Sequence, residues 1–79
     1  MDKISMRAAR INAELTQAQA AKCVGVSIKT LQMWERYETS PNAKYIDKIC
    51  EAYGRSYDGI AFTQEQLKPK RDRISNSNS

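Results

Sequence analysis

Residues 15–36 read LTQAQAAKCVGVSIKTLQMWER, and this stretch predicts two short helices joined by a tight turn. Thr16 is a good N-cap, and Gln19 three residues later completes a capping-box pattern. Gly25 is expected to end the first helix with a positive φ. Ser27 is expected to cap a second helix over residues 28–36.

The second helix of this stretch is expected to have two faces. Leu31 and Trp34 lie three residues apart on one face, which should pack against the first helix. The other face and the helix start carry Ile28, Lys29, Gln32, Met33 and Arg36. Lysine can donate to guanine, glutamine can pair with adenine, and apolar atoms can contact a thymine methyl. This face therefore has the chemistry to read a DNA major groove.

The motifs LTQ, GVS and WE, at fixed offsets between Arg10 and Pro41, resemble the Cro and phage-repressor (XRE-type) family of helix-turn-helix proteins. The resemblance covers residues 1–62. It implies an all-α, compact, five-helix, lambda-repressor-like DNA-binding domain.

The flanking sequence supplies the other three helices. We expect a first helix over residues 1–12, capped by Asp2, with an apolar stripe of Ile4, Ala8 and Ile11. A fourth helix should begin after the cap Asn42 and run to Tyr53, with Gly54 ending it. Its buried face is expected to consist of Ile46, Ile49, Cys50 and Tyr53. A short fifth helix, capped by Ser56, should contain Tyr57, Ile60 and Phe62.

The composition changes at Thr63, so residues 63–79 are expected to form a separate, disordered basic tail. Its positive charges are Lys68, Lys70, Arg71 and Arg73. The tail is either a solubilising end or a weak arm that adds phosphate contacts.

Two positions lack the glycine that the resemblance implies. Near Glu14, either Asn12 or Glu14 is expected to adopt the left-handed backbone conformation. Tyr37 stands at the C-cap of the helix over residues 28–36. Either its backbone is left-handed, at a cost of ~1 kcal/mol, or the helix runs on for a residue or two.

The composition excludes several classes of protein. The chain has 79 residues, a net charge of +4 and no histidine. A basic domain suits a polyanion, although many soluble domains carry this much charge. Without histidine, paired catalytic carboxylates or a glycine-rich phosphate loop, we expect no enzyme, no metal and no cofactor. Cys23 and Cys50 read as small buried hydrophobes. No apolar run could cross a bilayer and no signal peptide is visible, so we expect a cytoplasmic protein. The DNA binding that the resemblance implies would make it nucleoid-associated.

Arg10 has two interpretations. A lone helix arginine is commonly solvated, whereas the resemblance implies an ion pair with Glu35. That pair would tie the first helix to the end of the helix over residues 28–36. It would also place the guanidinium near a phosphate.

The function that the resemblance implies is sequence-specific binding of double-stranded DNA. The residues expected to contact bases are Ile28, Lys29, Gln32 and Met33. The residues expected to contact the DNA backbone are Arg10, Thr16, Gln17, Ser27, Arg36, Thr39, Ser40, Asn42 and Lys44. Simpler roles remain open: Gln17 can be merely solvated, Ser27 merely a cap, and Lys29 a phosphate contact only.

We expect a small transcriptional regulator, a phage- or prophage-type repressor. Such proteins bind palindromic operators as two-fold dimers, and without a separate dimerisation domain the dimer should be weak and tighter on DNA. The alternative is a protein-binding module, such as the DNA-binding antitoxin of a toxin–antitoxin pair. In that case Ile28 and Met33, or the tail, would bind the partner.

Overall fold

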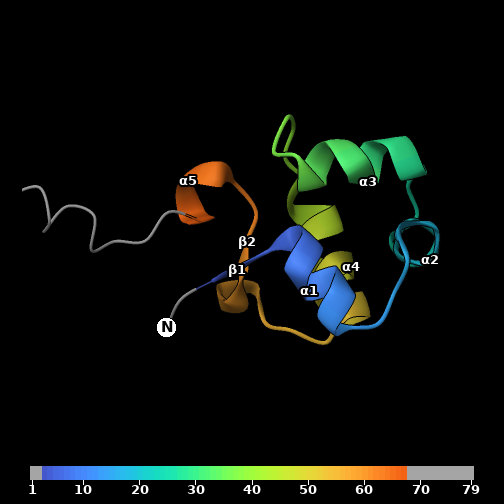
Figure 1. The fold of residues 1–79 in the computed structure, drawn as a ribbon, viewed down its shortest axis with the longest axis horizontal. Helices are drawn as coiled ribbons and strands as arrows, with labels where there is room; N and C mark the ends of the chain where they lie inside the picture. The colour runs from blue at the N-terminus through green and yellow to red at the C-terminus, as the bar shows by residue number, and fades with distance from the viewer. Residues whose placement is uncertain (1–2, 68–79) are drawn as a thin grey trace, which may run out of the picture.

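The computed structural model describes residues 3–67, which form four packed helices, a small strand pair and a final helical turn (Figure 1). The elements in chain order are β1 Ile4–Ser5, α1 Met6–Asn12, α2 Gln17–Val24, α3 Ile28–Glu35, α4 Ala43–Tyr53, a 3-10 turn Tyr57–Gly59, β2 Ile60–Ala61 and α5 Gln64–Leu67. The fold is mostly helical, as the sequence predicts.

The helix starts of α2, α3 and α4 are capped as predicted. The Thr16 hydroxyl accepts from the Gln19 N–H at 3.1 Å, and the Gln19 side chain accepts from the Thr16 N–H at 2.9 Å. Ser27 caps α3 and Asn42 caps α4 through their side chains. Each cap satisfies a backbone donor that has no partner within its helix.

Helices α1 to α4 all end in the same way, with one residue in the left-handed conformation. These residues are Glu14 (φ 62°), Gly25 (φ 90°), Tyr37 (φ 62°) and Gly54 (φ 69°). The following N–H then reaches back to a carbonyl five residues earlier, as from Val26 to Ala21 at 3.0 Å and from Glu38 to Met33 at 3.0 Å. Glu14, rather than Asn12, therefore replaces the expected glycine. Helix α3 does not run on, because Tyr37 turns the chain.

The first helix begins later than predicted. Ser5 caps α1, its hydroxyl accepting from the Ala8 N–H at 3.0 Å, whereas Asp2 lies outside the described residues. The apolar stripe of Ile4, Ala8 and Ile11 was also wrong. Ile4 belongs to β1 and the Ile11 side chain is 48% exposed. The buried residues of α1 are Met6, Ala9 and Arg10.

The segment after α4 differs from the predicted fifth helix. Tyr57–Gly59 is a single 3-10 turn, Ser56 makes no side-chain cap, and Ile60 and Ala61 form β2. β2 pairs in parallel with β1, Ile4 opposite Ile60 and Ser5 opposite Ala61. The fifth α-helix is instead α5, whose first turn Thr63 caps by accepting from the Gln66 N–H at 3.2 Å.

The core lies between α1, α2, α3 and α4 and is closed at one side by β2. It consists of Met6, Ala9, Ala20, Ala21, Val24, Leu31, Trp34, Ile49, Tyr53, Ile60 and Phe62. Ile46 and Cys50 of α4 pack against its edge rather than within it. Cys23 is exposed, contrary to prediction, and both cysteines are free thiols. The basic residues expected in the tail, Lys68 to Arg73, lie outside the described residues.

Candidate nucleic-acid interface

The turn between α2 and α3 is closed by two hydrogen bonds to one carbonyl. The N–H groups of Gly25 and Val26 both donate to the Ala21 carbonyl, at 2.8 and 3.0 Å. A Cβ on Gly25 would meet nothing within 4 Å. The glycine is therefore favoured by its positive φ and not by a lack of space. Val26, half-buried, packs against the core and anchors the turn.

Helix α3 has the two faces that its sequence predicts. Leu31 is fully buried and Trp34 is 4% exposed, with the Trp34 ring 5.6 Å from the Tyr45 ring of α4. Ile28 and Lys29 are exposed, whereas Gln32 and Met33 are half-buried. The helix is therefore anchored on one side and leaves its first turn open to a ligand.

Arg10 and Glu35 form a buried ion pair that joins α1 to the end of α3. The Arg10 Nε donates to Glu35 Oε2 at 2.7 Å, and the two side chains are 9% and 5% exposed. A second guanidinium nitrogen donates to Glu35 Oε1 at 3.3 Å, and the third donates to the Leu15 carbonyl at 2.9 Å. A solvated Arg10 is thus ruled out, and the pair fixes α3 against α1.

Two glutamines extend this ion pair across α2 and α3. Gln17 Nε2 donates to Glu35 Oε1 at 3.2 Å, and Gln32 Nε2 donates to Gln17 Oε1 at 3.2 Å. From the sequence, Gln17 and Gln32 were each predicted to contact DNA, and their contact with each other was not predicted. No local pattern signals it, because the two residues belong to different helices.

A recess of about 330 Å³ lies where these three helices meet. Its lining residues are Arg7, Gln17, Gln32, Glu35 and Arg36. Arg7 was missing from the predicted interface, although it lies one helical turn before Arg10, a spacing that places both on one side of α1. Arg10 neutralises Glu35, and Arg36 has only a long, exposed contact of 3.9 Å with Glu38. Arg7 and Arg36 therefore give the recess an excess of positive charge. Such a recess suits a phosphate.

The remaining predicted backbone contacts lie in the loop between α3 and α4 and in the first turn of α4. Thr39, Ser40, Asn42 and Lys44 are all exposed, and Figure 1 shows this loop rising beside the C-terminal end of α3. Asn42 spends its side-chain oxygen on capping α4, accepting from the Tyr45 N–H at 3.3 Å. Thr16 and Ser27 are likewise exposed and occupied as caps.

Tyr37 anchors the start of that loop. Its hydroxyl accepts from the Met6 N–H at 3.2 Å and donates to the Ala61 carbonyl at 2.8 Å. Burial raises the pKa of the Tyr37 hydroxyl, the bond from Met6 opposes this, and the charge of Glu35 raises it further. The side chain thus supplies two contacts that a glycine at this position would lack.

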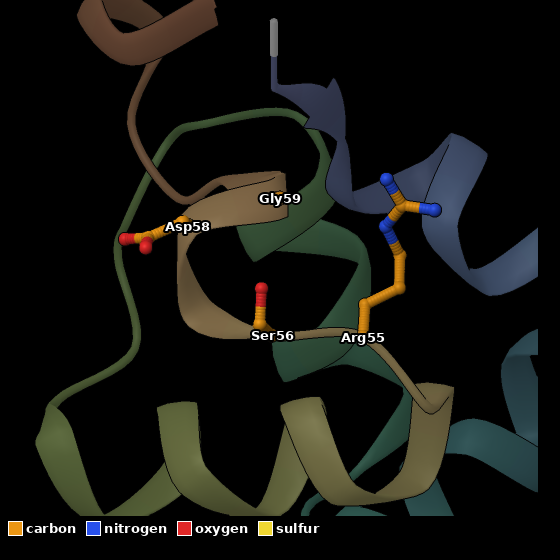
Figure 2. A pocket seen from close by; sticks show the side chains of 4 residues that line it. All are labelled: Arg55, Ser56, Asp58 and Gly59. Carbon is orange, nitrogen blue, oxygen red and sulfur yellow. The ribbon is translucent and has the colours of Figure 1, made fainter. Parts of the chain in front are cut away.

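A second and larger hollow, of about 470 Å³, lies between α4 and β2 (Figure 2). It is lined by Arg55, Ser56, Asp58 and Gly59. Figure 2 shows the Asp58 carboxylate pointing away from the Arg55 guanidinium, with the Ser56 hydroxyl between them. These groups do not converge on one point, so we do not assign a site to this hollow.

The part of the chain that the structure describes contains no group of three or more side chains suited to hold a metal ion. Within residues 3–67 there is also no helix long and apolar enough to span a membrane.

A capped helix pair that turns at a left-handed glycine and presents one face of its second helix defines the helix-turn-helix class of DNA-binding regulators. The comparison with known families agrees, since the Helix-turn-helix family matches residues 6–60. The chain therefore belongs to the Cro and phage-repressor (XRE-type) helix-turn-helix family, and this membership points to a DNA-binding regulator.

One curated relative is Antitoxin PezA of Streptococcus pneumoniae serotype 4 (strain ATCC BAA-334 / TIGR4). It is 31% identical over 68 residues, which is 86% of this chain and 43% of the antitoxin. The chain thus spans less than half the length of that relative. No solved structure matches the chain.

Proposed function

We propose that this protein binds double-stranded DNA sequence-specifically, with α3 in the major groove, and acts as a small transcriptional repressor of phage or prophage type. The observation that carries the proposal is the way α3 is held. Leu31 and Trp34 anchor one face and the Arg10–Glu35 pair fixes its end, while Ile28 and Lys29 remain exposed. A rigid helix with a free mixed face is what base readout requires.

In this proposal the roles divide between bases and phosphates. Ile28, Lys29, Gln32 and Met33 contact base edges, and the two apolar side chains favour thymine methyl groups. The phosphate contacts come from the start of α2, the ends of α3, the loop after α3 and the first turn of α4. They are Thr16, Gln17, Ser27, Arg36, Thr39, Ser40, Asn42 and Lys44. We add Arg7, because it lines the recess that Arg36 also lines. Arg10 also remains among the proposed phosphate contacts, because its three nitrogens donate three hydrogen bonds within the protein and the guanidinium has five N–H donors.

Selection of binding sites from random duplexes tests the proposal. We expect a preferred site that survives excess competitor DNA, and weaker binding when its thymines are replaced by uracil. A binding that never distinguishes any duplex from bulk competitor would refute sequence-specific recognition. If the protein binds DNA but shows no sequence preference, the result would support the proposed phosphate contacts and not the proposed base contacts.

We further propose that the protein binds a palindromic operator as a weak homodimer that tightens on DNA, in the cytoplasm and at the nucleoid. Two half-sites about one helical turn apart would then be selected together. Sedimentation with and without the selected duplex tests this. A tight dimer in the absence of DNA would contradict the weak association.

A second candidate function is the DNA-binding part of an antitoxin. The likeness to Antitoxin PezA favours it. Here Ile28 and Met33 would face a partner protein instead of thymine. Co-expression with the product of the neighbouring gene separates the two candidates. A stable complex that survives purification, and that Ile28→Ala weakens, supports the antitoxin, whereas a protein that purifies alone and still selects a duplex supports the repressor.

A further inference from the structure

The hydrogen bonds from Gln32 through Gln17 to Glu35 have a fixed direction. The Glu35 carboxylate, ion-paired with Arg10 at 2.7 Å, can only accept hydrogen bonds. The end of the Gln17 amide that faces it must therefore be the Nε2 donor, as found at 3.2 Å. This leaves the Gln17 Oε1, an acceptor, facing α3.

The direction is passed on to Gln32. Because Gln17 offers Gln32 only an acceptor, Gln32 must turn its own Nε2 donor toward α2, as found at 3.2 Å. An amide flipped the other way would set two carbonyl oxygens against each other and lose the bond. The amide is planar and its two ends point apart, so an Nε2 aimed at α2 leaves Oε1 aimed away from it. Within residues 3–67, the Gln32 side chain donates a hydrogen bond to Gln17, and its Oε1 accepts none.

We propose that the Gln32 Oε1 is a fixed acceptor for the exocyclic amine of a base, adenine N6 or cytosine N4, and that Gln17 sets this preference without touching the base. This inference rests on the proposed function. Guanine O6 and thymine O4 are hydrogen-bond acceptors in the same groove. Either atom would be repelled by the Gln32 oxygen, which is also an acceptor. Gln17 is thus a positioning residue for specificity, in addition to any contact with phosphate.

This changes what Gln17→Ala should do. As a phosphate contact alone, Gln17 would affect every duplex equally. If Gln17 instead orients Gln32 through their hydrogen bond, removing the Gln17 side chain frees the Gln32 amide to flip. The Gln32 amide can then accept from a base amine or donate to a base carbonyl with similar ease. Discrimination at one base pair should then fall by about fivefold, which is the factor that one hydrogen bond contributes.

The experiment compares affinities of the full chain for the selected duplex and for single-base variants of it. Wild type should prefer adenine or cytosine at one position, and Gln32→Ala should abolish that preference. Gln17→Ala should reduce the same preference about fivefold and leave the ratios at other positions unchanged. Which base is selected identifies the amine. Replacing that base by an analogue without its exocyclic amine should lower wild-type affinity to the level of the disfavoured bases.

Gln19→Ala is the matched control, because Gln19 lies on the same helix and bonds the Thr16 N–H instead of α3. It should leave every ratio unchanged. Ratios of two affinities for one variant are insensitive to partial unfolding, so a destabilised variant still gives a valid answer. If wild type distinguishes no duplex, the proposed function fails and this inference falls with it. If wild type discriminates but Gln17→Ala preserves every ratio, or Gln32→Ala alters no base preference, the inference alone is overturned.

Discussion

The Tyr37 hydroxyl donates a hydrogen bond of 2.8 Å to the Ala61 carbonyl, which ties the end of α3 to the strand pair. The same hydroxyl accepts from the N–H of Met6, the first residue of α1, at 3.2 Å. One side chain therefore joins three segments that are far apart in the sequence. Its left-handed backbone costs roughly 1–2 kcal/mol, and these two bonds offset that cost.

Tyr37→Phe should lower the free energy of unfolding by about 1–3 kcal/mol, because it leaves two backbone groups without their partner and keeps the ring. For a domain of this size, each 1 kcal/mol corresponds to roughly 4–8 °C in Tm. Thermal and urea denaturation measure the change. Tyr57→Phe is the control, since the Tyr57 side chain is exposed and should lose nothing. Equal stabilities of the two variants would show that the Tyr37 hydroxyl contributes nothing.

Glu35→Gln should lower the free energy of unfolding by about 3–5 kcal/mol, because it leaves the Arg10 charge buried without a counter-charge. The double variant Arg10→Met with Glu35→Leu removes both charges. It should cost less than the sum of Arg10→Met and Glu35→Leu measured separately. A double-mutant cycle by urea denaturation gives the coupling. The control pair is Arg36–Glu38, which is 3.9 Å apart and exposed, and its coupling should be about 0–1 kcal/mol. Equal coupling of the two pairs would contradict the role given to burial.

Tyr53→Phe should leave the protein as stable as before, or make it more stable by up to about 1–3 kcal/mol. The Tyr53 hydroxyl is buried and has no hydrogen-bond partner within the described chain. Its removal therefore ends a desolvation penalty and leaves a void no larger than a single oxygen atom. The urea midpoint at neutral pH measures the effect. A loss of more than about 1 kcal/mol would mean that this hydroxyl has a partner, since that is the contribution of one hydrogen bond.

Alkaline pH should destabilise the fold partly through the same residue. Burial, assisted by the charge of Glu35 and opposed by Arg10, raises the pKa of Tyr53 from 10.0 to about 12. Between these values the folded state holds a proton that the unfolded state has released, so stability falls as pH rises through this window. The difference in urea midpoint between wild type and Tyr53→Phe should stay constant from pH 8 to about 10 and change between about 10 and 12, with Tyr53→Phe losing less stability. Parallel curves would contradict the raised pKa.

Lys29→Ala should change base preference, with discrimination at one position reduced by about 1–3 kcal/mol. Lys44→Ala should instead weaken binding to all duplexes alike and lower the salt dependence by about one counterion. Lys22→Ala is the control and should do neither, because Lys22 is an exposed residue in the last turn of α2. If Lys29→Ala behaves like Lys44→Ala, Lys29 contacts phosphate only.

The capped helix pair could be predicted from sequence because its signals are local. Thr16 with Gln19, Gly25, and Ser27 act within one turn of the residues they cap, and the buried face of α3 repeats at helical spacing. The family and the mostly helical fold followed from the same residues. The Arg10–Glu35 pair needed more than periodicity, and the resemblance supplied it.

The strand pair could not be predicted from sequence because two residues are too few for an alternating pattern, and the partners lie at opposite ends of the domain. Because β1 was not predicted, the first helix was predicted to begin too early. Ile11 was then assigned to the buried face of α1, and the buried residues Met6 and Ala9 were not recognised. Tyr37 was recognised as a non-glycine cap, but its bonds to Met6 and Ala61 depend on the tertiary fold. The contact between Gln17 and Gln32 depends on how α2 and α3 pack, which no single segment encodes.

The parallel pairing of Ile4 with Ile60 has a consequence during synthesis. The first strand leaves the ribosome long before its partner exists, and contacts between residues so distant in sequence are slow to form. Until Ala61 is translated, the nascent chain must carry Ile4 and Met6 without the segment that covers them. The complete core is thus available only to a polypeptide that has almost finished elongating through this domain.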